Sequence, residues 1–302
     1  MSYFIFGGSG FIGTHLIALI DNLYPGTKIY NLDIVENNHE GKSTYINCDV
    51  RSEINIDIPV TSEDVIFNFA AVHRTPGHPD QAYFETNIRG AENVCAFAEK
   101  FGIKKIVFTS SIAPYGAAED LKTEEMLPTP NTPYGISKLV AEKTHAIWQA
   151  KKTNERQLTI VRPGVVFGKG ENGNFTRLYW GIRGGKFFYP GRKDTIKACI
   201  YVKELVRFML YRLENHNEGV ELYNCTYEPA FTIEQIVETM KKATGLQRTI
   251  VKVPGSLLMT VASIVGPLGG KALGICPARV KKLMISTNIC CLLYTSDAAD
   301  DS

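Results

Sequence analysis

The amino-acid sequence predicts an α/β fold, in which a doubly wound parallel sheet is followed by a smaller C-terminal lobe. Three observations support this prediction. Short apolar runs alternate with helix-length segments through the first half of the chain, which is typical of a parallel sheet with helices on both faces. The first apolar run leads directly into a glycine-rich turn and a helix. After residue 163 the alternation stops.

The same periodicity places the individual elements. Strands are expected at 2–6, 28–32, 65–69, 105–109 and 158–161, and helices at 11–22, 80–101 and 133–151. Further along, we expect a strand–helix unit at 198–213, a strand at 220–224 and helices at 232–244, about 256–265 and about 277–287. Residues 1–165 with about 198–225 are therefore assigned to the sheet domain, and residues 166–197 and 226–289 to the lobe.

The composition is that of an ordinary globular protein, with 44% hydrophobic and 21% charged residues. Seven cysteines without metal-ligand spacing indicate reduced thiols, and no metal site is expected. No signal-peptide pattern precedes the first strand, which favours a cytoplasmic location. The net charge of +2 gives no evidence for a nucleic-acid partner.

The first strand runs into Gly7-Gly8-Ser9-Gly10-Phe11-Ile12-Gly13, where a helix begins. Glycine lets the turn adopt unusual backbone angles and lets a diphosphate approach the main chain. The N–H groups at the start of the helix then face the phosphates. This pattern predicts a Rossmann-type dinucleotide site that uses Gly7, Gly10, Phe11, Ile12 and Gly13.

Asp33 ends the second expected strand, twenty residues after Gly13. An acid at this position accepts hydrogen bonds from the adenosine ribose and repels a 2′-phosphate. Because residues 34–37 contain no arginine, NAD is favoured over NADP as the cofactor.

Tyr134 and Lys138 lie four residues apart, on one face of an expected helix. Thr109-Ser110-Ser111 ends an earlier strand, at the edge where ligands bind. A free phenol has a pKa near 10, and a nearby ammonium and the positive nicotinamide would lower it. We therefore expect Ser111, Tyr134 and Lys138 to form a catalytic group.

With these motifs, residues 1–289 resemble an extended short-chain dehydrogenase/reductase of the sugar epimerase–dehydratase group. The resemblance implies that Tyr134 is the general acid/base, that Lys138 holds the nicotinamide ribose, and that Ser111 binds the reacting oxygen. It also implies further cofactor residues at Asp49, Val50, Phe69, Ala70, Ala71, Asn87 and Pro163. Substrate contacts are expected at His73, Arg74, Asn174 and Lys197.

Two differences from related enzymes restrict the reactions that this chain is expected to catalyse. The Asp-Glu pair of the 4,6-dehydratases is replaced by Ser110-Ser111, and Ile112 replaces the cysteine of the fucose-nucleotide enzymes. The remaining reaction is 4-epimerisation through a 4-keto sugar. Several segments, among them 70–74, 155–163, 184–187 and 278–282, resemble bacterial epimerases that act on undecaprenyl-diphosphate-linked N-acetylglucosamine. The substrate is thus expected to be a nucleotide- or undecaprenyl-diphosphate-linked hexosamine.

Two other functions share these motifs. A one-way alcohol or hydroxysteroid-like dehydrogenase would use the same cofactor, serine, tyrosine and lysine, but would consume NAD stoichiometrically. A non-catalytic NAD-binding protein would share the fold, although such proteins usually lack the tyrosine–lysine pair.

Residues 241–290 contain eight basic residues and no acidic one, and 254–270 carry no charge. Such a surface fits peripheral contact with the inner leaflet of a membrane; the alternative is a core helix with solvated lysines around it.

A homodimer through the two long helices beside the central strands is also expected from the resemblance. Residues 290–302 fit nothing before them and are interpreted as a non-native tail, so the natural chain would be cut near Ile289 and could be inactive.

Overall fold

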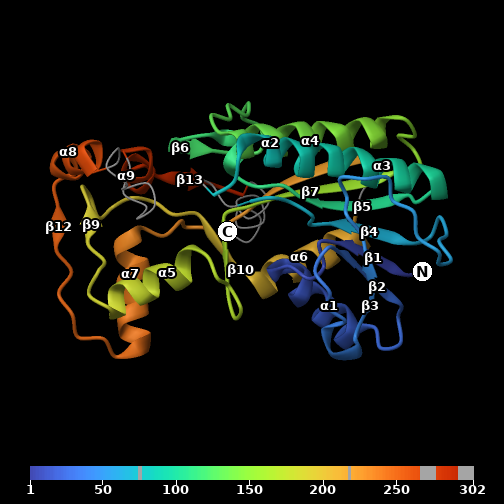
Figure 1. The fold of residues 1–302 in the computed structure, drawn as a ribbon, viewed down its shortest axis with the longest axis horizontal. Coiled ribbons are helices and arrows are strands. Elements are labelled where there is room, and N and C mark those ends of the chain that lie inside the picture. The colour runs from blue at the N-terminus through green and yellow to red at the C-terminus, as the bar shows by residue number, and fades with distance from the viewer. Residues whose placement is uncertain (74–76, 217–218, 266–276, 292–302) are drawn as a thin grey trace, which may run out of the picture.

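A seven-stranded, fully parallel sheet forms the centre of the protein in the computed structural model, which describes residues 1–73, 77–216, 219–265 and 277–291 (Figure 1). Its strands lie in the order β11-β7-β5-β4-β1-β2-β3. They are β1 (Tyr3–Phe6), β2 (Ile29–Asp33), β3 (Thr44–Asn47), β4 (Val65–Asn68), β5 (Lys105–Thr109), β7 (Gln157–Pro163) and β11 (Gly219–Cys225). This order has the topological switch of a doubly wound fold between β1 and β4, so the expected fold class is confirmed.

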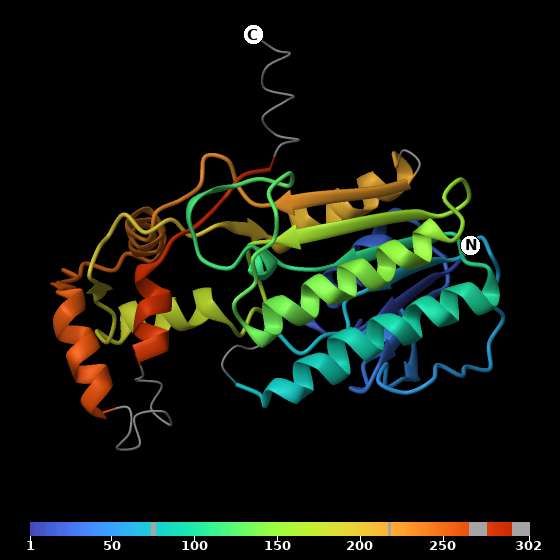
Figure 2. The ribbon, with the colours of Figure 1, turned by 90° about the horizontal axis from the view of Figure 1, so that it is seen from above.

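Helices cover both faces of the sheet. The helices of the first part are α1 (Phe11–Leu23), α2 (Asp80–Tyr83), α3 (Arg89–Phe101), α4 (Pro133–Ala150) and α6 (Val202–Glu214), with short turns η1 (His39–Gly41), η2 (Phe84–Ile88) and η3 (Ala113–Tyr115). In Figures 1 and 2, α3 and α4 lie side by side on one face, with α1 and α6 on the other. Two hydrophobic clusters fill the two layers between sheet and helices.

Local sequence explains where the long helix α4 starts. Thr132 precedes it, and its Oγ1 accepts a hydrogen bond from the Gly135 amide at 3.1 Å. Pro133 occupies the first helical position, where no hydrogen-bonded N–H is needed. These signals place Tyr134 and Lys138 in the first two turns of α4, next to the end of β5.

A smaller lobe lies at one end of the sheet (Figure 1). It is built from α5 (Asn174–Arg183), α7 (Ile233–Thr244), α8 (Gly255–Val265) and α9 (Pro277–Met284). Short parallel pairs join β8 (Val165–Phe167) to β10 (Cys199–Tyr201), β9 (Tyr189–Pro190) to β12 (Lys252–Val253), and β6 (Ala118–Lys122) to β13 (Thr287–Ile289). The expected boundaries between sheet domain and lobe stay a prediction.

The structure differs from the expected elements at several places. The helix α5 and the short strands β8, β9 and β12 were not expected. β3 and β6 were not expected, because both strands are short and largely solvent-accessible and so show weak apolar alternation. The expected helix 80–101 is interrupted by the π-turn η2, and the expected helix 277–287 ends at Met284 and gives way to β13. β13 pairs with β6, more than 160 residues earlier in the chain, and Thr287 also bridges to Lys197. Local periodicity does not predict such long-range pairing.

Cys48, Cys95 and Cys199 are buried free thiols. Within the described ranges, no helix combines the length and hydropathy needed to cross a membrane. Three of the expected features lie wholly or partly outside the described residues: the substrate residue Arg74, the end of the uncharged stretch, 266–270, and nearly all of the expected tail.

Candidate active site

The glycine-rich turn between β1 and α1 has the close backbone packing expected of a phosphate site. Gly7 has φ +76°, and a Cβ on it would lie 2.7 Å from the Ala70 nitrogen. A Cβ on Gly13 would lie 2.5 Å from the Gly8 backbone, so α1 packs directly against the turn. Gly10 caps α1 without a side-chain hydrogen bond, which leaves the N–H groups of the first turn, at Phe11 and Ile12, for a ligand. This cradle fits the diphosphate of NAD.

Asp33 lies at the end of β2, beside this turn. Its two carboxylate oxygens accept hydrogen bonds from the backbone amides of Ser9 and Val35, each at 3.0 Å. The carboxylate is therefore held at the rim of the turn, in the position that suits a ribose hydroxyl. Each oxygen of a carboxylate accepts more than one hydrogen bond, so capacity remains for a ligand.

Asp49 and Val50 follow β3 and differ from each other in environment. The Asp49 carboxylate pairs with Arg51, at 2.6 Å between Oδ2 and Nη2. The Val50 side chain is buried in the core and contacts the position of Gly90 on α3. Because this side chain points into the core, Val50 can meet an adenine ring only through its backbone.

The segment after β4 lines the same edge of the sheet. Phe69 and Ala70 pack against the two hydrophobic clusters, and Ala71 is partly exposed beside them. Asn87, within the π-turn η2, is buried and hydrogen-bonds both backbone groups of Val72, at 2.8 and 3.1 Å. Its amide also donates to Ser137 Oγ at 2.8 Å. Asn87 therefore joins this loop to α4, and both of its side-chain N–H groups and its Oδ1 have partners within the protein.

Ser111 and Tyr134 are brought together from β5 and α4. Ser111 Oγ accepts the Ala113 amide at 3.1 Å, and the Ser111 hydroxyl hydrogen-bonds the Tyr134 phenol. The Tyr134 ring faces that of Tyr83, with 6.1 Å between centroids. The carbonyl of Pro163, at the end of β7, accepts the Ile112 amide at 3.2 Å, which fixes β7 beside this group.

Lys138 is 3% exposed, and its ammonium has two neutral neighbours. Nζ donates to the Thr109 carbonyl at 2.7 Å and lies 4.7 Å from the centre of the Phe108 ring. Phe108 in turn stacks on His145, with 4.1 Å between centroids. The lysine is thus fixed at the end of β5, next to the serine that contacts Tyr134.

The expected lowering of the Tyr134 pKa is not produced by the protein alone. Burial raises the pKa of Tyr134 to about 12, although the hydrogen bond from Ser111 opposes this rise. Burial also lowers the pKa of Lys138 to about 7, and the nearby Glu142 carboxylate opposes that change. Desolvation disfavours the charged form of each group, and its effect on the two pKa values exceeds that of the Ser111 hydrogen bond and of the Glu142 charge.

Sequence reasoning missed the polar residues behind this group. Glu142 lies one helical turn after Lys138, and its carboxylate accepts from Ser110 Oγ at 2.5 Å. Arg162 donates to both oxygens of the same carboxylate, at 2.8 and 2.6 Å. The spacing of four residues between Lys138 and Glu142 was the available signal, since it places both on one helix face.

The expected substrate residues are dispersed. His73 is exposed at the end of its loop. Lys197 donates from Nζ to the Ile285 carbonyl at 2.7 Å, which ties it to the end of α9. Asn174 begins α5, and its Oδ1 accepts from Arg177 at 2.9 Å. The next residues of α5 line a cavity of about 290 Å³ together with Phe167, Gly168, Glu171, Tyr179 and Met240.

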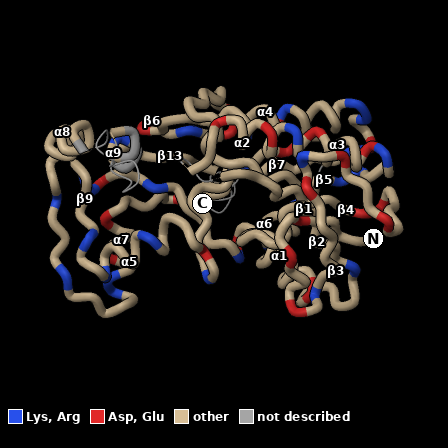
Figure 3. The backbone as a smooth tube through the Cα atoms, in the orientation of Figure 1, with Lys and Arg blue, Asp and Glu red and all other residues tan. Residues whose placement is uncertain are grey.

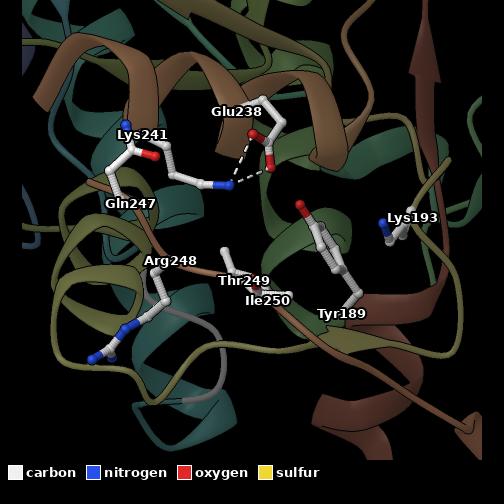
Figure 4. A pocket seen from close by; sticks show the side chains of 8 residues that line it. All are labelled: Tyr189, Lys193, Glu238, Lys241, Gln247, Arg248, Thr249 and Ile250. Carbon is white, nitrogen blue, oxygen red and sulfur yellow. Dashed lines mark hydrogen bonds and ion pairs between the residues drawn. The ribbon is translucent and has the colours of Figure 1, made fainter. Parts of the chain in front are cut away.

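A larger cavity, of about 350 Å³, lies within the lobe between β9, α7 and the segment before β12 (Figure 4). The Tyr189 ring and the Glu238–Lys241 ion pair, with contacts of 2.9 and 3.0 Å, face each other across it. It is lined by Tyr189, Lys193, Glu238, Lys241, Gln247, Arg248, Thr249 and Ile250. None of the expected site residues lines it, so this cavity is separate from the Ser111–Tyr134–Lys138 group.

Comparison with known proteins agrees with this geometry. Residues 3–226 match the NAD dependent epimerase/dehydratase family. The chain is 34% identical over 286 residues to an Escherichia coli O157:H7 protein named N-acetyl-alpha-D-glucosaminyl-diphospho-ditrans,octacis-undecaprenol 4-epimerase, covering 94% of this chain and 85% of that protein. It is 25% identical to an Arabidopsis thaliana 3beta-hydroxysteroid-dehydrogenase/decarboxylase, covering 92% of this chain and 70% of the relative.

Solved structures share the fold. MoeE5 in complex with UDP-glucose and NAD superposes with a TM-score of 0.71 at 22% identity, covering 84% of this chain and 85% of that one. The UDP-N-acetylglucosamine 4-epimerase from Bacillus cereus gives a TM-score of 0.69 at the same identity and coverage. The expectation of NAD as the cofactor is confirmed by the family match. The chain belongs to the NAD dependent epimerase/dehydratase family.

Proposed function

We propose that this protein is an NAD-dependent 4-epimerase of N-acetylglucosamine carried on undecaprenyl diphosphate. The observation that carries the proposal is that α4 places Tyr134 and Lys138 beside the end of β5, where Lys138 Nζ donates to the Thr109 carbonyl at 2.7 Å and Ser111 lies next to the Tyr134 phenol. This group lies at the same edge of the sheet as the glycine turn and Asp33. The 34% identity to the Escherichia coli O157:H7 epimerase supports the choice of carrier.

The residues divide the chemistry among them. Ser111 orients the sugar 4-hydroxyl and the phenol of Tyr134 toward each other. Tyr134 takes the hydroxyl proton during oxidation and returns a proton during reduction, as a general base and then a general acid. Lys138 supplies the positive charge that favours the phenolate. A bound NAD would supply the hydride acceptor for the oxidation and the hydride donor for the reduction.

One assay separates this proposal from its alternatives. The protein is incubated with undecaprenyl-diphosphate-linked N-acetylglucosamine and, separately, with UDP-N-acetylglucosamine, and the C4 epimers are resolved by chromatography. We expect the galacto epimer from the lipid-linked substrate with no net change in NADH absorbance. Stoichiometric NADH formation would instead indicate a one-way dehydrogenase. If the protein bound NAD but formed neither the galacto epimer nor NADH, the result would indicate a non-catalytic NAD-binding protein.

We also propose that α8 is a peripheral membrane contact. Leu257, Val261 and Ile264 recur on one face of this helix and are 54%, 43% and 61% exposed. The described side chains of α8 carry no charge, and the exposed Lys252 of β12 stands just before it. Figure 3 shows Lys and Arg along this end of the lobe beside the uncharged α8. An apolar helix face beside basic residues fits the surface of a bilayer that contains anionic lipid.

Flotation with lipid vesicles tests this contact. We expect the protein to float with vesicles that contain phosphatidylglycerol and less with purely zwitterionic ones. Leu257→Glu with Ile264→Glu should abolish flotation, because it places two carboxylates on the apolar face. The control, Leu127→Glu, alters a side chain that is 86% exposed elsewhere. Equal flotation of both variants would disprove the role of α8.

A further inference from the structure

Glu142 and Arg162 form a buried ion pair directly behind the catalytic group. The two residues are 2% and 3% exposed. The guanidinium binds the carboxylate through Nε and Nη2, and Ser110 donates a third hydrogen bond to Glu142 Oε1. The other face of the guanidinium lies 4.7 Å from the centre of the Tyr115 ring. Three charge-assisted contacts thus fix the carboxylate in one orientation.

This carboxylate lies next to the catalytic group, and its direct partners are Ser110 and Arg162. Glu142 is on the same face of α4 as Lys138, one turn further on. Ser110 stands between Thr109, whose carbonyl binds the Lys138 ammonium at 2.7 Å, and Ser111, which hydrogen-bonds Tyr134. A change at Glu142 would therefore alter the electrostatic environment of Lys138. It would also alter the position of Ser111, because Ser110 precedes Ser111 in the chain.

The charges of this buried cluster do not cancel. Lys138 and Arg162 are cations, and Glu142 is the carboxylate that lies between α4 and β7. The contacts of the Lys138 ammonium described above are a carbonyl and an aromatic ring, both of them neutral. A buried ammonium without a nearby negative charge loses its proton readily. Around it, the ionisable groups are Tyr134, Glu142 and His145 on α4, Arg162 on β7 and Tyr115 on η3, while Tyr83 of α2 faces Tyr134.

We propose that Glu142 is a positioning residue that keeps Lys138 protonated and holds the Ser110–Ser111 strand end in place, with Arg162 fixing its carboxylate. The proposal rests on the assigned roles of Tyr134 and Lys138 in the proposed function. Its consequence is that phenolate formation at Tyr134 depends on a carboxylate that touches neither substrate nor cofactor.

A merely structural role makes a different prediction. If Glu142 served only to neutralise Arg162, removing both charges together would restore the site, because well-packed apolar replacements of a buried ion pair are often neutral for stability. The single variant Glu142→Gln leaves Arg162 without its partner and impairs the site under either role. The double variant Glu142→Gln/Arg162→Met removes that complication and keeps similar side-chain volumes.

The test is an ultraviolet titration of the Tyr134 phenolate, with and without NAD. Each background is compared with the same protein carrying Tyr134→Phe, so that the difference reports this phenol alone. We expect the double variant to show about tenfold less phenolate than the unmodified protein at a given pH, which corresponds to about one pKa unit. Glu142→Asp, which keeps the charge, should recover most of the phenolate.

An unchanged titration in the double variant would overturn the proposal. The measurement needs no substrate, so it decides the role of Glu142 even if the sugar assay identifies a different reaction. The epimerisation rate provides a second readout. In the double variant, kcat should fall while the KM for the sugar stays within about twofold, because Glu142 does not contact the substrate.

Discussion

Lys138 donates a hydrogen bond from its ammonium to the carbonyl oxygen of Thr109 across 2.7 Å, which fixes the catalytic helix to the end of strand β5. The next residues of that strand end, Ser110 and Ser111, contact Glu142 and Tyr134. A single strand end thus positions the lysine, the serine and, through the serine, the tyrosine.

Replacing Tyr134 by phenylalanine should lower turnover by about 10²–10⁴, the usual contribution of a general acid/base. NAD affinity should hardly change, because the variant keeps the ring that packs near Tyr83. Steady-state rates and calorimetric NAD titrations measure the two effects. Tyr211→Phe, at a site that is 55% exposed, is the matched control. Full activity of Tyr134→Phe would remove the assigned role.

The variant Asp33→Asn should weaken NAD binding by about tenfold. A hydrogen bond to a charged acceptor contributes about 1.5–3 kcal/mol and one to a neutral acceptor about 0.5–1.5 kcal/mol, and a difference of about 1.4 kcal/mol is tenfold in affinity. The amide keeps the shape of the side chain, and its oxygen can still accept from Ser9 or Val35. Fluorescence or calorimetric titration with NAD gives the affinity. Glu36→Gln, three residues further on, should leave it unchanged. Equal affinities of the two variants would contradict the ribose contact.

Acid should destabilise the protein through His145, which is fully buried between Phe108 and Asn68. Burial lowers the pKa of His145 from 6.5 to about 4. Because the unfolded chain binds this proton more readily, the folded state loses stability as pH falls through 6.5 toward 4. At about 1.36 kcal/mol per pKa unit, the full effect is about 3 kcal/mol.

Urea unfolding at a series of pH values measures this loss. The variant His145→Gln removes the ionisable ring, so its stability should fall less over the same pH window. Parallel slopes for the two proteins would exclude His145 as the source.

The exposed face of α4 should mediate a dimer, as the family resemblance implies. Ile136, Val140 and Ile147 recur at helical spacing there and are 40%, 38% and 62% exposed. Val140→Lys with Ile147→Lys should therefore shift the protein toward a monomer in sedimentation velocity, because it places charges in an apolar contact. Leu127→Lys, at an exposed apolar residue outside this face, is the control. A monomer in the unmodified protein would contradict the expected dimer.

Much of the fold followed from local patterns. The strands and helices of the first half lie within about two residues of their expected ends, because each has a periodic apolar face and a recognisable start, such as Pro133 for α4 or the glycine turn for α1. Most of the elements that were missed are short strands, and β6, β8, β9, β12 and β13 pair with segments far away in the chain. β3 pairs with the nearby β2 but has little apolar alternation, and the helix α5 lies in a glycine-rich stretch where no element was expected. The local sequence of these elements therefore does little to predict them.

The chain by itself determined which chemical groups the site contains: the glycine turn, Asp33, and the serine, tyrosine and lysine of the catalytic group. Only the tertiary structure decided what surrounds them. It turned the Val50 side chain into the core, made Asn87 a link between a loop and α4, and placed the Glu142–Arg162 pair behind Lys138. The pKa values of Tyr134 and Lys138 depend on the same surroundings, because desolvation is set by every segment that packs around a group and by no single motif.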